Sequence, residues 1–216
     1  MEIIPAILTN DEEIFKRQIE QSVAIGAKTV QVDFTDGKFV NSKTLIPDEL
    51  DSFVISKSGL ILEAHLMIEN PEKFFATLYA LGFKRIAPHF EALLDPAKAL
   101  SIAHDYGLEI GLALNPETQL EKIESFIQQI NFVLFLTVVP GEQGRSFETP
   151  VLDKITDFHS QYPDIPIEVD GGIKHDNIQT VANTGADRIV VGSGIWHSGN
   201  PQTAFNQLQT AASTVI

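Results

Sequence analysis

A short junction recurs along the 216-residue chain and restricts its fold more than any other feature. An amphipathic segment ends at a glycine, and an apolar, β-rich run begins two or three residues later. The junction occurs at Gly26-Ala27-Lys28-Thr29-Val30, Gly82-Phe83-Lys84-Arg85-Ile86, Gly107-Leu108-Glu109-Ile110 and Gly185-Ala186-Asp187-Arg188-Ile189. Such a glycine can take a positive φ and end a helix, after which a right-handed crossover returns the chain to a parallel sheet. The chain is therefore predicted to repeat a strand–helix unit.

The predicted strands are nearly continuous apolar runs, as expected when helices cover a parallel sheet. They are Ile3–Ala6, Thr29–Asp33, Leu60–Met67, Arg85–Pro88, Glu109–Leu114, Phe132–Val138, Ile167–Val169 and Arg188–Val191. The predicted helices are Glu12–Ala24, Glu72–Leu81, Pro96–Tyr106, Leu120–Ile127, Pro150–Gln161, His175–Thr184 and Pro201–Ala212. Asn70, Asp95 and Asn200 each precede a proline and are predicted to cap the helix that follows. About eight units in a chain of this length predict one α/β domain, a (β/α)₈ TIM barrel over residues 1–216, with an open doubly wound sheet as the alternative.

Charge restricts the partners of such a barrel. The chain has 15 Lys and Arg against 29 Asp and Glu, which gives a net charge of −14. Nucleic acid and anionic membranes are therefore excluded as expected partners, although backbone N–H groups could still bind a small anion. The chain has no cysteine, so a metal site must use histidine, carboxylate or amide oxygen. No apolar run approaches the roughly 20 residues that span a bilayer, so a cytoplasmic location is expected.

Polar residues end several of the predicted strands, where the active site of a TIM barrel forms. Asp33, His65 and Asp170 are predicted to reach the same rim of the barrel. Two carboxylates and an imidazole could bind a divalent metal or transfer protons. Each residue also has a purely structural explanation: an Asp before Gly, as at Asp36 and Asp170, often forms a turn, and a histidine in an apolar strand can belong to the core.

Two glycine clusters follow the last two predicted strands. They are Gly171-Gly172, before Ile173, and Gly192-Ser193-Gly194. In TIM barrels the loops at these places often present backbone N–H groups and a short helix N-terminus to a phosphate. Turning the chain is the alternative role for these glycines, but their occurrence after both strands favours a phosphate site.

Motifs along essentially the whole chain together resemble one family. They are Ile4-Pro5-Ala6-Ile7-Leu8, Val32-Asp33-Phe34-Thr35-Asp36-Gly37-Lys38-Phe39-Val40, Ala64-His65-Leu66-Met67-Ile68-Glu69-Asn70-Pro71, His89-Phe90-Glu91-Ala92, Leu114-Asn115-Pro116, Thr137-Val138-Val139-Pro140-Gly141, Glu168-Val169-Asp170-Gly171-Gly172 and Val191-Gly192-Ser193. The family is that of the ribulose-phosphate 3-epimerases. The resemblance implies a ribulose-phosphate-binding TIM barrel, a phosphorylated ketopentose substrate, and interconversion of ribulose 5-phosphate and xylulose 5-phosphate in pentose phosphate metabolism.

The resemblance also implies roles for individual residues. Asp33 and Asp170 match the two aspartates that move the C3 proton and bind a divalent metal, commonly zinc, and His65 matches a metal-binding histidine. The phosphate- and substrate-binding positions that match are Gly141, Gly144, Gly171, Gly172, Gly192 and Ser193. A small phosphorylated sugar is the expected partner, and a homo-oligomer is the expected assembly.

Departures from the family pattern fall inside the expected site. Gln31 stands where the family has a further metal-binding histidine. An amide oxygen binds zinc less well than imidazole does, so Gln31 should weaken the metal, remove it, or favour a harder ion such as Mn²⁺, Mg²⁺ or Fe²⁺. The remaining departures are Ala6, Thr35, Val139 and the segment Gly141-Glu142-Gln143-Gly144.

These departures leave two alternatives open. One is an epimerase for a different phosphorylated sugar, and the other is a degenerate barrel that binds a sugar phosphate without turnover. Related decarboxylases use an Asp-x-Lys-x-x-Asp pattern, and Asp33-Phe34-Thr35-Asp36 lacks that lysine.

Overall fold

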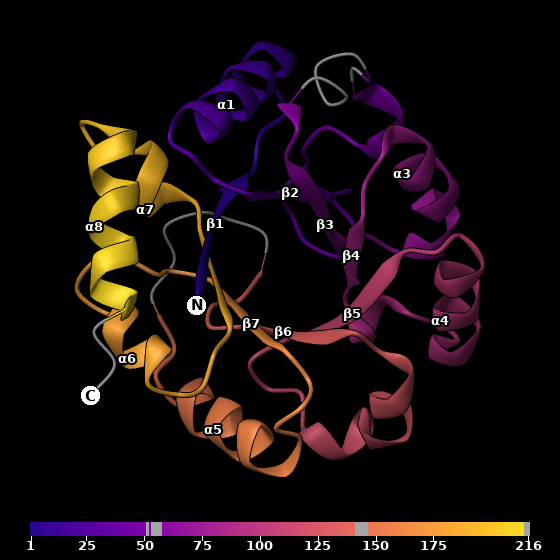
Figure 1. The fold of residues 1–216 in the computed structure, drawn as a ribbon. Helices are drawn as coiled ribbons and strands as arrows, with labels where there is room; N and C mark the ends of the chain where they lie inside the picture. The colour runs from indigo at the N-terminus through magenta and orange to yellow at the C-terminus, as the bar shows by residue number, and fades with distance from the viewer. Residues whose placement is uncertain (51, 53–57, 141–146, 214–216) are drawn as a thin grey trace.

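The strands of the computed structural model close into a barrel. The structure describes residues 1–50, 52, 58–140 and 147–213. Eight parallel strands pair in chain order, and β8 pairs with β1 to complete the ring (Figure 1). The strands are β1 (Glu2–Ile7), β2 (Thr29–Thr35), β3 (Ile61–Met67), β4 (Arg85–Pro88), β5 (Glu109–Leu114), β6 (Phe132–Leu136), β7 (Ile167–Asp170) and β8 (Arg188–Val191). Closure confirms the predicted barrel and rules out the open sheet.

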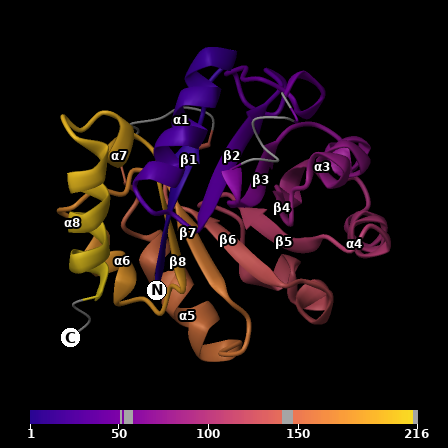
Figure 2. The ribbon, with the colours of Figure 1, turned by 45° about the horizontal axis from the view of Figure 1, so that its top comes forward.

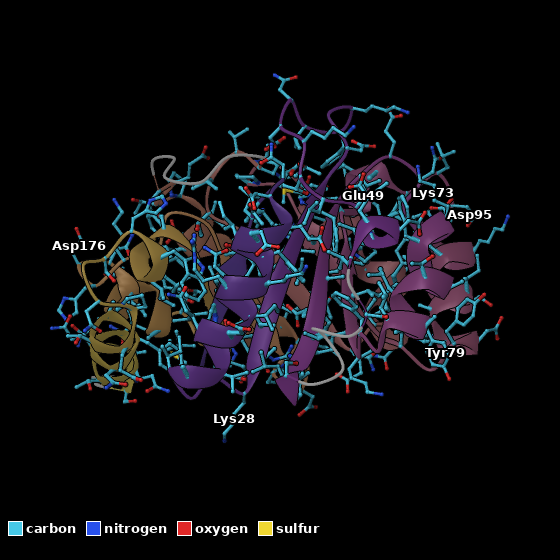
Figure 3. The ribbon with its side chains drawn as sticks, turned by 90° about the horizontal axis from the view of Figure 1, so that it is seen from above. Lys28, Glu49, Lys73, Tyr79, Asp95 and Asp176 are labelled. Carbon is cyan, nitrogen blue, oxygen red and sulfur yellow. The ribbon has the colours of Figure 1, made fainter. Side chains whose placement is uncertain are left out.

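Helices form a layer around the strands. They are α1 (Glu12–Ala24), α3 (Phe75–Leu81), α4 (Pro96–Asp105), α5 (Val151–Gln161), α6 (Ile178–Ala182), α7 (Ser193–Trp196) and α8 (Pro201–Ser213). In the tilted view α8 lies alongside α7, and it also packs against β1 (Figure 2). Among the described residues, no helix combines the length and the apolar character needed to cross a membrane. Lys28, Lys73, Asp95 and Asp176 lie in the segments that join strands and helices, and their side chains are at the surface (Figure 3).

The recurring glycine junction has the predicted conformation. Gly26, Gly82, Gly107 and Gly185 have φ values of 80°, 91°, 71° and 92°. Each ends a helical segment, and the next strand begins within three residues. The motif therefore marks helix ends correctly at all four places.

Three of the predicted helices differ from the structure. The segment predicted as a helix at Leu120–Ile127 forms two 3₁₀ segments, Leu120–Lys122 and Glu124–Gln129. Its apolar residues Leu120, Ile123 and Phe126 are spaced by three, which matches the three residues per turn of a 3₁₀ helix. The segment predicted as Glu72–Leu81 begins with a 3₁₀ turn, Pro71–Phe74, before α3, and the helix predicted at His175–Thr184 is reduced to α6.

Two of the three predicted caps are present. The Asp95 carboxylate accepts the Lys98 N–H at 3.0 Å, and the Asn200 side chain accepts the Thr203 N–H at 3.0 Å. The prediction for Asn70 is wrong, because Asn70 takes a left-handed backbone conformation (φ 51°) and its side chain makes no capping bond. Asn tolerates this conformation better than most residues, so it serves here as a turn residue.

A layer of charged side chains fills the barrel near the start of the strands. Arg85 Nη1 lies 3.2 Å from Glu63 Oε2, and Arg188 Nη1 lies 3.2 Å from Glu168 Oε2. Both carboxylates are fully buried. Burial, followed by the nearby Glu63 carboxylate, raises the pKa of Glu168 well above its ordinary value. These four groups compensate one another at the end of the barrel opposite the predicted active-site rim.

Candidate active site

Four polar side chains from three strands meet inside the barrel, above the charged layer. Gln31 and Asp33 lie two residues apart on β2 and therefore point to the same side of the strand. His65 on β3 is the register partner of Asp33, and Asp170 ends β7. Gln31 is fully buried, and His65 and Asp33 are 1% and 8% exposed. The strand pattern thus brings together the three residues that the sequence predicted at one rim, with Gln31 among them.

The amide of Gln31 connects the two carboxylates. Its Nε2 donates to Asp33 Oδ1 at 2.7 Å and to Asp170 Oδ2 at 2.8 Å, and it lies 3.5 Å from His65 Nδ1. Its Oε1 is buried and has no hydrogen-bond partner within the part of the chain that the structure describes. The two N–H groups of one amide therefore hold together two carboxylates that would otherwise repel each other.

Asp33, His65 and Asp170 also fit a divalent cation. One carboxylate oxygen from each aspartate and one imidazole nitrogen all lie within 4.8 Å of one another. Oxygen and imidazole donors suit zinc as well as harder divalent ions. The unpaired Oε1 of Gln31 is a further oxygen donor next to this group. The residues present could therefore hold one divalent metal ion.

A chain of hydrogen bonds leads from His65 to the neighbouring strand end. His65 Nε2 lies 3.0 Å from His89 Nε2, and His89 Nδ1 lies 3.1 Å from Glu91 Oε2. Glu91 also accepts the Asn115 N–H at 3.0 Å and the hydroxyl of Thr118. The role of Glu91 was not among the predictions from the sequence. The signal was present in the His-x-Glu spacing at the end of β4, which places both side chains in the same loop.

The protonation states along this chain follow from its chemistry. Burial lowers the pKa of His89 to about 4 against the opposing effect of Glu91, so His89 is neutral and donates from Nδ1 to that carboxylate. The Nε2 of His89 then accepts, and His65 donates to it from Nε2. Burial also acts to lower the pKa of His65, but hydrogen bonds to Asp170 and Asp33 outweigh it and raise the pKa to about 9. His65 is therefore an imidazolium that also donates from Nδ1 toward the aspartates, at 3.2 Å from Asp33 Oδ1.

Asp33 has a raised pKa within this site. Burial is the main cause, the nearby Asp170 carboxylate adds to it, and the hydrogen bonds to His65 and Gln31 oppose it. Two carboxyl groups that share a pocket favour one protonated and one ionised partner. Such a pair can donate a proton from one carboxyl group and accept a proton at the other.

The glycine clusters line the same pocket as the acidic residues. Gly171, Gly172, Gly192 and Ser193 border it together with Asp33, His65 and Asp170. Gly171 has a φ of 118°, and a Cβ there would lie 2.7 Å from Val138 Cγ2, so only glycine allows this close approach of the β6 and β7 ends. Ser193 is the first residue of α7, where backbone N–H groups have no acceptor within the helix. Gly141 and Gly144 lie outside the described residues.

Other strand-end residues have structural roles. Asp36 accepts the N–H groups of Lys38 at 2.9 Å and of Glu69 at 3.0 Å, as expected for a turn-forming aspartate. Among the family departures, Ala6 lines the pocket. Thr35 is fully buried, and its N–H donates to the Thr44 hydroxyl at 2.9 Å. Val139 is 49% exposed.

Comparison with known proteins identifies a family from the sequence and a similar fold from the structure. The chain matches the model of the Ribulose-phosphate 3 epimerase family over residues 2–196. The ribulose-phosphate 3-epimerase of Schizosaccharomyces pombe is 29% identical over 211 residues, which is 97% of this chain and 92% of the relative. The ribulose-phosphate 3-epimerase of Helicobacter pylori strain J99 is 34% identical over 214 residues, 97% of each chain. Among solved structures, 3-hexulose-6-phosphate synthase from Salmonella typhimurium matches with a TM-score of 0.75 over 99% of both chains at 14% identity, a likeness of fold.

Proposed function

The chain belongs to the ribulose-phosphate 3-epimerase family, and we propose that it interconverts D-ribulose 5-phosphate and D-xylulose 5-phosphate in pentose phosphate metabolism. The observation that carries this proposal is the pair of carboxylates, Asp33 and Asp170, held in one pocket by the Gln31 amide. Epimerisation at a carbon next to a ketone needs two acid–base groups, because one proton leaves one face and another arrives on the opposite face. The family relationship favours this activity over a barrel that binds a sugar phosphate without turnover.

The reaction follows from the two carboxylates. The ionised aspartate removes the C3 proton, the electron pair of the C–H bond moves toward the ketone, and an enediolate forms. The protonated aspartate then returns a proton to C3 on the other face, and the reverse reaction exchanges the two roles. A divalent cation held by Asp33, His65 and Asp170 would supply Lewis acidity to the enediolate oxygens. Without the cation, the His65 imidazolium donates toward both aspartates and so holds them in place.

The phosphate of the substrate is assigned to the glycine clusters. The pocket is bordered by Gly171, Gly172, Gly192 and Ser193. No lysine or arginine is among the described residues that line it. Backbone N–H groups and the start of α7 therefore remain as donors for a dianion, which supports their assignment. Gly141 and Gly144 are assigned to the same phosphate-binding site, and only the family pattern supports their assignment.

The test is isotope exchange at C3. Purified protein is incubated with ribulose 5-phosphate in deuterated water, with chelator or with added Zn²⁺, Mn²⁺ or Mg²⁺, and deuterium at C3 is measured by NMR. Exchange is expected for the wild type and should fall by about 100-fold or more in Asp33→Asn and Asp170→Asn, as for loss of an acid–base group. Asp176→Asn, at an exposed position, is the matched control. Absence of exchange under every condition would refute the proposal.

The proposal also covers metal affinity, domain extent, cellular location and assembly. We expect a metal, zinc or a harder divalent ion, to bind more weakly than in a site with four strong ligands, because Gln31 offers at best an amide oxygen. Metal analysis of protein purified without chelator checks this, and stoichiometric, tightly held zinc would contradict it. A single domain over residues 1–216, a cytoplasmic location and a homo-oligomer also belong to the proposal, and light scattering after gel filtration tests the last.

A further inference from the structure

The amide nitrogen of Gln31 stands where a cation would be expected to stand. It makes its two hydrogen bonds, 2.7 Å and 2.8 Å long, to the aspartates of the candidate metal group, and it lies 3.5 Å from the imidazole nitrogen of the third member. An NH₂ group carries two partial positive charges, so it satisfies two carboxylates in the way a small cation would. In this orientation the amide and a cation exclude each other.

The other end of the same amide has the opposite chemistry. Oε1 of Gln31 is buried without a hydrogen-bond partner among the described residues. Oε1 and Nε2 are almost the same size, and a half-turn of the planar amide about the Cγ–Cδ bond exchanges them without changing the shape of the side chain. A half-turn alone would leave Oε1 at the place of the cation, so the side chain must also draw back from the two carboxylates. Oε1 would then face the ion beside Asp33, His65 and Asp170 as a fourth oxygen or nitrogen donor. Because Oε1 has no partner to lose, the rotation breaks only the bonds made by Nε2.

We propose that Gln31 is an amide switch: its NH₂ group replaces the cation when the site is empty of metal, and its Oε1 becomes the fourth ligand when a divalent metal binds. Each state excludes the other orientation. Without metal, an inward Oε1 would place a third partial negative charge beside two carboxylates. With metal, inward N–H hydrogens would point at a cation. Binding of the metal and rotation of the amide are therefore one coupled event.

The amide switch lies in the same pocket as the proposed function and adds a property of this chain, since Gln31 is a residue at which the chain departs from the family. It does not require turnover. Its test uses metal binding, side-chain NMR signals and thermal stability, whereas C3 exchange tests the function. Failure of one therefore leaves the other unaffected.

The direct measurement is the side-chain NMR signal of Gln31 in full-length, ¹⁵N-labelled protein. Loss of one pair of NH₂ cross-peaks in Gln31→Met identifies the signal. With chelator present, both protons should lie downfield of those of exposed glutamines and exchange slowly with solvent, because both bond to carboxylates. Titration with Zn²⁺, which is diamagnetic, should move the pair to positions typical of a free NH₂ group.

Three outcomes of this titration would overturn the switch or one of its two roles. Cross-peaks in chelator that match those of exposed glutamines would show that the amide does not bridge the carboxylates. Zinc binding, followed by calorimetry, that leaves the downfield pair in place would show that the metal binds without rotation. If the wild type binds no zinc at millimolar concentration, the proposed ligand role is wrong.

Variants at position 31 separate the two roles. Neither Glu nor Met can donate as the amide does, but only Glu offers an oxygen ligand. In chelator at pH 8, both Gln31→Glu and Gln31→Met should melt at lower temperature than the wild type. With zinc, Gln31→Glu should bind about tenfold or more tightly than Gln31→Met, the range typical for loss of a metal-site interaction.

The matched control for the added negative charge is Gln128→Glu, at an exposed position. It should leave both the melting temperature in chelator and the zinc affinity unchanged. Equal melting temperatures for the wild type and both position-31 variants in chelator would refute the cation-replacing role. Equal zinc affinities of Gln31→Glu and Gln31→Met would refute the ligand role. Should either variant fail to fold, the wild-type NMR titration decides the question.

Discussion

Replacing Glu91 by glutamine tests the hydrogen-bonded chain that runs from Glu91 through His89 to His65. Glu91 accepts from His89 at 3.1 Å, from the Asn115 N–H at 3.0 Å and from Thr118. Burial acts to raise the pKa of Glu91, but these hydrogen bonds outweigh it and lower the pKa from 4.5 to about 2. A carboxyl pKa lowered by this amount corresponds to about 3 kcal/mol of stability for the folded state.

The sign of the pH dependence follows from the lowered pKa. The unfolded chain binds a proton at Glu91 before the folded chain does, so the stabilisation is complete above pH 5 and is lost as the pH falls toward 2. In urea denaturation, the wild type should exceed Glu91→Gln by about 3 kcal/mol at pH 7 and by about half of that near pH 3. These values are upper limits, because solvent screens the charge of the partly exposed Glu91 side chain and because glutamine keeps an oxygen acceptor for the Asn115 N–H.

The control is Glu124→Gln, which removes a carboxylate at an exposed position. Its difference from the wild type should stay within about 0.5 kcal/mol at both pH values, as for an ordinary surface substitution. If the loss in Glu91→Gln is the same at pH 7 and at pH 3, the stabilisation does not come from the carboxylate charge, and the protonation scheme for His89 and His65 is wrong.

Two further predictions concern stability, measured by urea denaturation at pH 7. Glu168→Gln should cost less than Glu63→Gln, because burial and the Glu63 carboxylate raise the pKa of Glu168 and so favour its uncharged form, whereas Glu63→Gln leaves Arg85 beside a neutral group and should cost about 3 kcal/mol. Equal losses would contradict the charge assignment of this layer. Gly171→Ala should cost about 2 kcal/mol or more, because the φ of Gly171 is 118° and the new Cβ would lie 2.7 Å from Val138 Cγ2. An unchanged free energy of unfolding would show that the ends of β6 and β7 can move apart without cost.

The barrel could be predicted because its signal is local and repeated. A helix-ending glycine such as Gly82 or Gly185 needs only its own neighbours to adopt a positive φ, so the sequence marks it directly. The convergence of Asp33, His65 and Asp170 could also be predicted, since parallel strands in a barrel all end at one rim.

Other features depend on contacts that the sequence does not contain. The difference between an α-helix and two 3₁₀ segments at Leu120–Ile127 depends on how three apolar side chains spaced by three meet the core. The sequence shows that Gln31 departs from the family pattern. It does not show which end of the amide faces the carboxylates, because that orientation depends on Asp170, which is 139 positions away in the chain. The contact between Glu91 and Thr118 likewise joins two separate loops.

With a net charge of −14, the chain has few cationic side chains, and those that lie near the barrel interior are paired away from the active-site pocket. Arg85 and Arg188 pair with carboxylates in the lower layer, and Lys154 donates to three backbone carbonyls, the shortest contact being 2.8 Å. No lysine or arginine lines the active-site pocket among the described residues. A ketose phosphate must therefore find positive potential in backbone N–H groups, together with the His65 imidazolium when no metal is bound or the cation itself when His65 binds one. Because two aspartates occupy the same pocket, the amide of Gln31 has to offset their charge whenever that cation is absent, and this requirement links its orientation to the chemistry of the site.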